Sequence, residues 1–362
     1  MKAAERQPTD LQEELGRTYR RFAEGRAGEE SPLHARVALA LGGSPAALDA
    51  LSALPTRGRS PALVLAALHY LALKGRAPSL ADAYAAGDQD AAASAAVDAL
   101  VGGPEEVAAV VSRRQVPHHL ARPYAVLHPA IGAVARRVGA GAVGLVDVGS
   151  PAGLNLLVDG VSIAYSDGRR AGEPASPVAS VCRVVGERAV PTEPIPAVVA
   201  RVAAGTAPFD AADADDALWL RACLAPDDRD GLAALAAELA LASAAPPRLV
   251  RGDLAEAVPR ALDAVPPDAL PVVITTWSLS RLAAARRGRF LERLEEAALG
   301  RPVAWVAVEG VGVAPSVPTL GDRPASGHSI VGLAVLGPEG RWFAAAGRCW
   351  SRGRVLEWLG AG

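Results

Sequence analysis

The sequence predicts an α/β protein that carries an additional α-helical domain at its N-terminus. Residues 11–138 read as one helix after another, whereas after residue 140 short β-rich apolar runs alternate with helical segments. Alternation of this kind is typical of a parallel sheet covered by helices. With 362 residues the chain exceeds the usual size of one compact unit, and we expect two domains, residues 1–138 and 139–362.

Three Ser-Pro pairs predict helix starts in the N-terminal region, since each precedes an apolar stretch: Ser31-Pro32, Ser44-Pro45 and Ser60-Pro61. A serine side chain caps free backbone N–H groups, and proline is tolerated in the first helical turn. The segment after Ser60 is apolar almost all round, so we expect it to be the buried centre of a helical bundle. His69 in this segment is interpreted as a core residue without a chemical role.

Five apolar runs predict the strands of the second domain: AVGLVDVG, AVVARVA, RLVRGD, LPVVITTW and RPVAWVAVEG. Two further runs, HSIVGLAVLG and RWFAAAGRCW, are joined by a tight turn and predict a hairpin that ends in an antiparallel strand. A parallel series with one antiparallel C-terminal strand is the strand plan of the Rossmann-like methyltransferase fold. Residues 162–196 are rich in proline and are expected to form an inserted hairpin and loop.

Composition and charge argue against several classes of partner. The 37 Lys and Arg residues nearly balance the 39 Asp and Glu residues, so no global field attracts nucleic acid or an anionic membrane. We find neither a signal-peptide core nor an apolar run of the ~18 residues that cross a bilayer. Cys182, Cys223 and Cys349 are far apart, and no residues have metal-ligand spacing. We therefore expect a cytoplasmic protein with a small-molecule substrate and no bound metal.

The stretch LVDVGSPAGLN joins the first predicted strand to a predicted helix and has the pattern D-x-G-x-x-x-G, with Asp147, Gly149 and Gly153. Glycine lets the backbone pass close beneath a ligand, and free N–H groups at a helix start favour a carboxylate or a phosphate. An acid at the strand end would receive the amino group of the same ligand. These features favour S-adenosylmethionine, with Ser150 and Asn155 as further cofactor-binding residues. The alternative is that the glycines only allow the strand and the helix to pack closely.

Other candidate site residues lie beside later strands and before the α/β domain. Asp253 is placed to contact an adenine amino group, although capping of the next helix explains it equally well. Thr275, at the end of the fourth core strand, is assigned to the cofactor site. His118, His119 and Glu309 are candidate general bases. The two adjacent histidines could equally be surface residues of a linker.

Several stretches, in order and spacing, resemble a bacterial family of unknown function found mainly in GC-rich genomes: SPLHARVALAL, LVLAALHYLAL, VDVGSPAGLNLLVD, DALWLRACL, PPRLVRGDL and RPVAWVAVE. The resemblance covers most of the chain and implies a helical N-terminal domain and a class I S-adenosylmethionine methyltransferase-like core. The chain is a divergent member. Near Gly205 the family carries an aspartate that would bind the ribose hydroxyls, and it tends to have histidine and tyrosine at the positions of Thr275 and Arg281.

Three functional hypotheses follow. The first is a methyltransferase-like protein that binds S-adenosylmethionine over residues 149–153 and acts on a small molecule, a reaction that needs mainly alignment. The second is a related fold that no longer uses the cofactor and serves as a binding subunit or a cofactor-independent enzyme, which the change at Gly205 supports. The third is a protein-interaction module. The sequence determines neither the acceptor substrate nor the oligomeric state.

Overall fold

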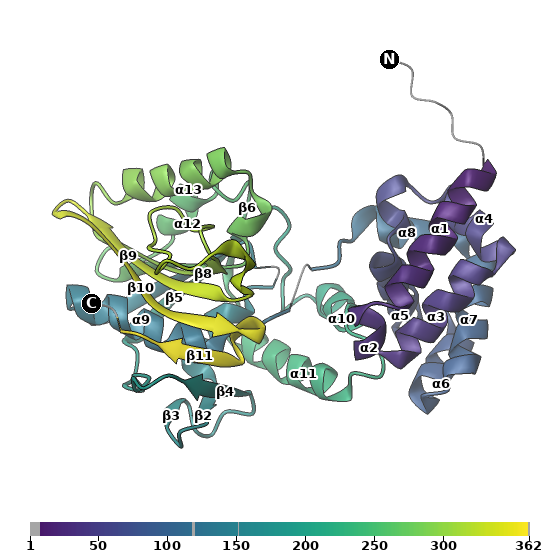
Figure 1. Ribbon diagram of the computed structural model, residues 1–362, viewed down its shortest axis with the longest axis horizontal. Coiled ribbons are helices and arrows are strands. Elements are labelled where there is room, and N and C mark those ends of the chain that lie inside the picture. Colours follow the sequence, from purple (N-terminus) through teal and green to yellow (C-terminus); the bar gives the residue numbers. More distant parts are fainter. Residues whose placement is uncertain (1–7, 118–119, 151, 361–362) are drawn as a thin grey trace, which may run out of the picture. The chain divides into compact units, whose positions relative to one another are not determined.

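The computed structural model describes residues 8–117, 120–150 and 152–360 (Figure 1). The contacts between residues divide the chain into two compact units. The first, here called the helical unit, contains Met1–His118 and Asp213–Ala236, and the second, the α/β unit, contains His119–Ala212 and Ala237–Gly362. Across the described ranges, no helix combines the length and the apolar character that crossing a membrane requires.

The helical unit contains α1 (Pro8–Ala23), α2 (Arg26–Glu30), α3 (Pro32–Gly43), α4 (Pro45–Ala53), α5 (Pro61–Leu73), α6 (Pro78–Ala86), α7 (Gln89–Gly102), α8 (Pro104–Arg113) and α10 (Ala214–Ala222). The predicted starts are confirmed, because Ser31, Ser44 and Ser60 stand at the N-caps of α3, α4 and α5. Ser31 and Ser44 each accept a hydrogen bond from the backbone N–H group three residues further along the chain. Almost every residue of α5 is buried, as its apolar surface predicts.

The boundaries of the two units differ from the predicted division at residue 138. Helix α9 (Tyr124–Val138) belongs to the α/β unit, because it packs against strands of the sheet and is buried from Tyr124 to Ala135. Helix α10 comes later in the sequence but belongs to the helical unit. Its Asp215 accepts a hydrogen bond from Tyr70 and pairs with Lys74, which fixes α10 against α5. Helical periodicity reveals that a segment is a helix but not which core it covers.

The α/β unit is built on a sheet with the strand order β3-β2-β4-β11-β10-β9-β8-β7-β1-β5-β6. The strands are β1 (Ala142–Val148), β2 (Ser162–Tyr165), β3 (Arg170–Gly172), β4 (Ala179–Val185), β5 (Ala197–Gly205), β6 (Arg248–Arg251), β7 (Leu270–Thr276), β8 (Val303–Gly310), β9 (Ser329–Gly337), β10 (Gly340–Trp350) and β11 (Val355–Trp358). The five predicted core strands are confirmed as β1, β5, β6, β7 and β8, and all five run parallel to one another. Their order is that of a doubly wound sheet, with the topological switch point between β1 and β7.

The C-terminal part of the sheet contains more antiparallel pairs than the single strand predicted. The hairpin is confirmed, but β9 is the strand antiparallel to β8, and β10 again runs with the parallel series. Strand β11 pairs with β10 and with β4. Residues 162–196 do contain a hairpin, formed by β2 and β3, but β4 also lies in this stretch and joins the hairpin to the main sheet. Apolar alternation marks a strand, but the pairing partner is chosen by the rest of the fold.

Helices cover both faces of the central sheet. Helices α12 (Val258–Leu262) and α13 (Ala284–Ala297) pack on the face that carries Val146, Val148 and Trp305. Figure 1 shows α9 on the other side of the sheet, where it contacts β8 and β9. Because successive side chains of a strand point to opposite faces, Asp147 points to the face opposite that of Val146 and Val148.

His69 is a core residue of α5, as predicted, and it makes the helical unit sensitive to acid. Its Nδ1 lies 3.1 Å from the carbonyl oxygen of Leu224, and burial lowers its pKa from 6.5 to about 4. Because the folded pKa lies below the unfolded one, the unfolded chain binds the proton first. The stability that the helical unit gains from keeping His69 neutral is complete above pH 6.5 and is lost as the pH falls toward 4.

We expect the hydrogen-exchange protection of the buried α5 amides to decrease between pH 6.5 and 4. The variant His69→Gln should weaken this dependence and leave the part contributed by His34, whose pKa burial also lowers to about 4. An identical pH dependence in the variant and the native chain would contradict the assignment.

Candidate functional site

The glycine turn follows β1 at the topological switch point, which is where open α/β sheets bind their ligands. Gly149 has a φ of 83° and Gly153 a φ of 61°, both in the left-handed region that favours glycine. A side chain at Gly149 would place its Cβ 2.6 Å from Cβ of Ser278. Both glycines are therefore required by the backbone of the turn.

The turn leads into a helix, as predicted, and this helix is the 3-10 helix η2 (Leu154–Gly160). Its apolar residues are buried on all sides, so the segment has no exposed face on which an amphipathic helix could continue. The N–H group of Gly149 donates to the carbonyl oxygen of Ala204 at 2.8 Å, and Arg281 donates to the carbonyl oxygen of Gly149 at 3.1 Å. The N–H group of Gly149 is therefore engaged within the protein, and an anion site at the start of η2 stays a prediction.

Asp147 and Asn155 form a buried polar pair beneath the turn. Asn155 Nδ2 lies 3.3 Å from Asp147 Oδ1 and 3.0 Å from Thr276 Oγ1. Burial raises the pKa of Asp147 to about 7, although hydrogen bonds from Asn155 and Ser150 act in the opposite direction. The structure thus brings three of the predicted residues together. A carboxyl group with this pKa can either hold or release a proton near neutral pH.

One oxygen of each member of this pair lacks a partner. In the part of the chain that the structure describes, Asp147 Oδ2 and Asn155 Oδ1 are buried and accept no hydrogen bond. A buried polar atom in this condition lowers stability by about 1–3 kcal/mol, and such atoms in native proteins call for an explanation such as a ligand or an ordered water.

A second buried charged cluster lies near Asp147, and the sequence analysis missed it. Glu238 is 2% exposed and accepts hydrogen bonds from Arg122 Nε at 2.8 Å and from the Tyr124 hydroxyl at 3.1 Å. Burial raises the pKa of Tyr124, and the negative charges of Glu238 and Asp147 add to this effect. A lone glutamate in the Ala-rich helix α11 (Arg229–Ala244) is the sequence signal that could have revealed the cluster.

Glu309 is the last residue but one of β8 and is held by the loop that follows β7. Its Oε1 accepts hydrogen bonds from the backbone N–H groups of Ser278 and Leu279, both at 3.1 Å. Burial raises the pKa of Glu309 to about 7. The same loop contains Trp277 with a φ of 51°, a conformation that is uncommon outside glycine and is found preferentially at functional sites. Glu309 is therefore a second carboxyl group poised to exchange a proton.

Thr275 lies on the face opposite the Asp147 pair. Its Oγ1 accepts a hydrogen bond from Trp305 Nε1 at 3.1 Å, and Trp305 packs in the core beneath α13. The residue of β7 that contacts the pair is Thr276, which binds Asn155. The residue that contacts the pair is thus one position later than the predicted Thr275. Because successive side chains of a strand point to opposite faces, this difference of one residue places Thr275 on the other face of the sheet.

The predicted adenine-binding acid has partners within the protein. Asp253 forms an ion pair with Arg286 and accepts a hydrogen bond from the N–H group of Ala255 at 3.1 Å. Asp253 therefore stabilises the turn before α12 but does not cap that helix, whose N-cap residue is Ala257. It does not bring Asp253 into contact with Asp147 or Asn155.

The ribose position at the end of β5 has no acid. The site of a side chain at Gly205 is open, with Gly149 Cα the nearest described atom at 3.9 Å. The two neighbouring acids make local hydrogen bonds, Asp210 with the N–H group of Ala212 and Asp213 as the N-cap of α10. The residues at this strand end therefore do not fit the ribose of S-adenosylmethionine.

His118 and His119, the predicted bases, lie outside the described residues. Elsewhere in the chain, among the residues that are described, no three His, Cys, Asp or Glu side chains come together in a group that could hold a metal ion. The candidate site consequently consists of the Asp147–Asn155 pair, the Glu238 cluster and Glu309.

The turn geometry gives a matched pair of variants. Gly149→Ala should reduce the free energy of unfolding by roughly 1–3 kcal/mol, because the left-handed backbone and the contact with Ser278 both oppose a side chain. Gly205→Ala, at an open position in the same region, should change it by less than about 0.5 kcal/mol. Urea unfolding of both variants provides the measurement, and equal losses would disprove this account of the turn.

Replacement of Asp147 should act in a pH-dependent way. The folded pKa of about 7 lies above the ordinary value of 3.8, so the contribution to stability is present below pH 3.8 and is lost as the pH rises to 7. Between pH 3.8 and 7, the free energy of unfolding of Asp147→Asn should therefore increase relative to that of the native chain by about 1.4 kcal/mol per pH unit. Unfolding free energies at several pH values test this, and a constant difference would contradict the raised pKa.

Comparison with known proteins gives one match. No curated protein and no solved structure matches the chain. A family model described as "Uncharacterized protein conserved in bacteria (DUF2332)" matches residues 16–358, which includes nearly all of both units. The chain therefore belongs to this bacterial family.

Proposed function

We propose that the α/β unit binds a small polar organic molecule at the carboxyl ends of β1 and β7, and that Asp147 exchanges a proton with it without S-adenosylmethionine. The observation that carries this proposal is the buried Asp147–Asn155 pair. It lies at the switch point of the sheet, and each residue keeps one buried oxygen without a partner.

The chemistry of the pair suggests the kind of group it would bind. Asn155 Oδ1 can only accept a hydrogen bond, whereas Asp147 Oδ2 can accept one or, when protonated, donate one. A hydroxyl or an amide N–H of a ligand would satisfy Asn155. Asp147, with a pKa of about 7, would take up or deliver the proton, and the buried Glu238 cluster would add further polar contacts.

Two features argue against S-adenosylmethionine as the ligand. The N–H group of Gly149 is already bonded to Ala204, and Gly205 supplies no acid for the ribose.

The methyltransferase-like function remains the second candidate, favoured by the strand order around β1 and by two left-handed glycines after it. In that case Asp147 and Asn155 would position the cofactor, Asp253 would contact adenine and Glu309 would accept a proton from the acceptor molecule. Bound S-adenosylmethionine would supply an activated methyl group, and the protein would supply mainly alignment.

Calorimetry separates the two candidates. Under our proposal, neither S-adenosylmethionine nor S-adenosylhomocysteine produces binding heat at millimolar concentration. Saturable binding of either compound that Asp253→Asn weakens would establish the second candidate instead. The unfolding transition of the variant provides the control for its integrity.

A thermal-shift panel tests the proposal directly. We expect at least one member of a panel of small amides, alcohols and hydroxy acids to raise the melting temperature of the native chain. Asp147→Asn and Asn155→Leu should abolish that shift, whereas Asp253→Asn, outside the pair, should retain it. Stabilisation that survives both substitutions in the pair would contradict the proposal, as would a panel without any binder.

A further inference from the structure

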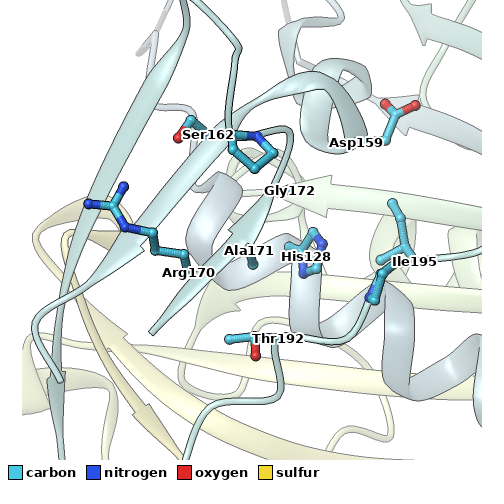
Figure 2. A pocket seen from close by; sticks show the side chains of 10 residues that line it. His128, Asp159, Ser162, Arg170, Ala171, Gly172, Thr192 and Ile195 are labelled. Carbon is cyan, nitrogen blue, oxygen red and sulfur yellow. The ribbon is translucent and has the colours of Figure 1, made fainter. Parts of the chain in front are cut away.

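A cavity of about 220 Å³ lies within the α/β unit, separate from the residues assigned above (Figure 2). Helix α9 and residues 159–195, which contain β2 and β3, provide its walls. The lining residues are His128, Asp159, Ser162, Arg170, Ala171, Gly172, Pro174, Thr192, Pro194 and Ile195. This site is independent of the function proposed for the glycine turn.

The walls of the cavity are fixed by the fold. The Tyr165 hydroxyl at the end of β2 donates to the carbonyl oxygen of Ala125 at 2.8 Å and so holds the strand against α9. Gly172 has a φ of 73°, and a Cβ there would lie 2.0 Å from the carbonyl oxygen of Val161. The walls are therefore preformed, which reduces the entropy lost when a ligand binds.

Asp159 brings to the cavity a carboxylate oxygen that no described residue satisfies. Its Oδ2 pairs with Arg201, which also donates to the carbonyl oxygen of Leu156 at 3.0 Å. Its Oδ1 is buried and, in the part of the chain that the structure describes, has no hydrogen-bond partner. An ionised carboxylate can only accept hydrogen bonds, so a ligand that satisfies Oδ1 has to be a donor.

His128 supplies a second buried polar group without a partner. It is 1% exposed, and its Nδ1 is buried without a hydrogen bond to any described residue. Burial lowers its pKa to about 4, so the ring is neutral at physiological pH and one of its nitrogens can accept a hydrogen bond. Figure 2 shows the ring in the middle of the lining residues. The cavity therefore contains a neutral acceptor in addition to the carboxylate.

The positive charges around the cavity are either paired or in solvent. Arg170, which is part of the lining, is exposed, and Figure 2 shows its guanidinium group directed away from His128. A charge in solvent is screened by water and salt. Arg136, whose charge also acts on His128, forms an ion pair with Glu193 at 3.7 Å. Among the lining residues, the charged atom that is both buried and available to a ligand is therefore Asp159 Oδ1.

The remaining lining combines two hydroxyl groups with hydrocarbon surface. Ser162 and Thr192 add oxygens that can accept hydrogen bonds. The hydrocarbon surface comes from Ala171, Pro174, Pro194 and Ile195. Drug-sized ligands occupy pockets of about 300–1,000 Å³, so this cavity suits a smaller molecule. Acceptors beside an apolar wall fit a short alkyl chain that ends in one group of donors.

We propose that this cavity binds a short-chain primary amine in its ammonium form. An alkylamine is protonated at neutral pH, as the lysine side chain is, and its three N–H groups donate. One N–H group donates to Asp159 Oδ1, so that the carboxylate is shared between the ligand and Arg201, and a second donates to the ring of His128. A hydroxyl oxygen of the lining accepts the third, and the alkyl chain lies against the hydrocarbon surface. A carboxylate ligand is repelled by Asp159.

Calorimetry on the full chain with butylammonium chloride, butyltrimethylammonium chloride, 1-butanol and sodium butyrate tests the proposal. We expect saturable binding of butylammonium and no binding of butyrate. The trimethyl compound keeps the charge but has no N–H group, and 1-butanol keeps a donor but has no charge. Each should therefore bind more weakly than butylammonium by about tenfold or more, because a charge-assisted hydrogen bond is lost.

A matched pair of variants tests the role of the carboxylate. Asp159→Asn should weaken the binding of butylammonium about tenfold or more, since the negative charge that accepts from the ligand is removed. The control is Asp167→Asn, which removes a carboxylate from the turn between β2 and β3. Asp167 is not part of the lining, so this variant should bind butylammonium like the native chain.

A second measurement, on the native chain, keeps the test independent of folding defects in the variants. Butylammonium should shift the imidazole ¹⁵N resonances of His128 and leave those of His69, in the helical unit, unchanged. The proposal is overturned if butylammonium does not bind or does not shift the His128 resonances. It is also overturned if butyltrimethylammonium or 1-butanol binds equally well, or if Asp159→Asn and Asp167→Asn have the same effect.

Discussion

The close approach of the turn after β1 to its neighbours is the constraint on which the α/β unit depends. The N–H group of Gly149 binds the end of β5, and its Cα lies so near Ser278 that no side chain fits. This contact joins the two halves of the doubly wound sheet at their switch point. Asp147, two residues before Gly149, is completely buried although it is ionisable and lies near the end of a strand.

Three carboxyl groups of the α/β unit are buried, and each is only partly satisfied. Asp147, Glu238 and Glu309 each receive hydrogen bonds on one oxygen, and each has another without a described partner. Burial of this kind opposes folding, so the surrounding core must compensate for it. Groups held in this condition at a ligand-binding edge are those that a binding or catalytic role would explain.

The extension of the sheet shows how a segment that interrupts a fold can create a site. Residues 162–196 are rich in proline and lie between two core strands in the sequence, yet β4 joins the far edge of the sheet through β11. Strands β2 and β4 contact α9, and His128 of α9 lines a cavity together with residues of this segment. Prolines and short strands predict turns but not what those turns enclose.

The sequence by itself determined the elements of this protein. Ser-Pro pairs, apolar alternation and the two glycines after β1 act through local backbone and side-chain preferences, so the helix starts, the core strands and the Asp147–Asn155 region could be predicted from residue order alone. Only the tertiary structure decided that α9 belongs to the α/β unit and α10 to the helical unit. The 3-10 form of the helix after the turn, and the contact of Thr276 rather than Thr275 with the Asp147–Asn155 pair, also depended on it. The Glu238 cluster also required the fold, because Arg122 and Glu238 are separated by 116 positions and meet only after packing. Contacts between distant residues depend on the arrangement of whole elements, which local preferences do not specify.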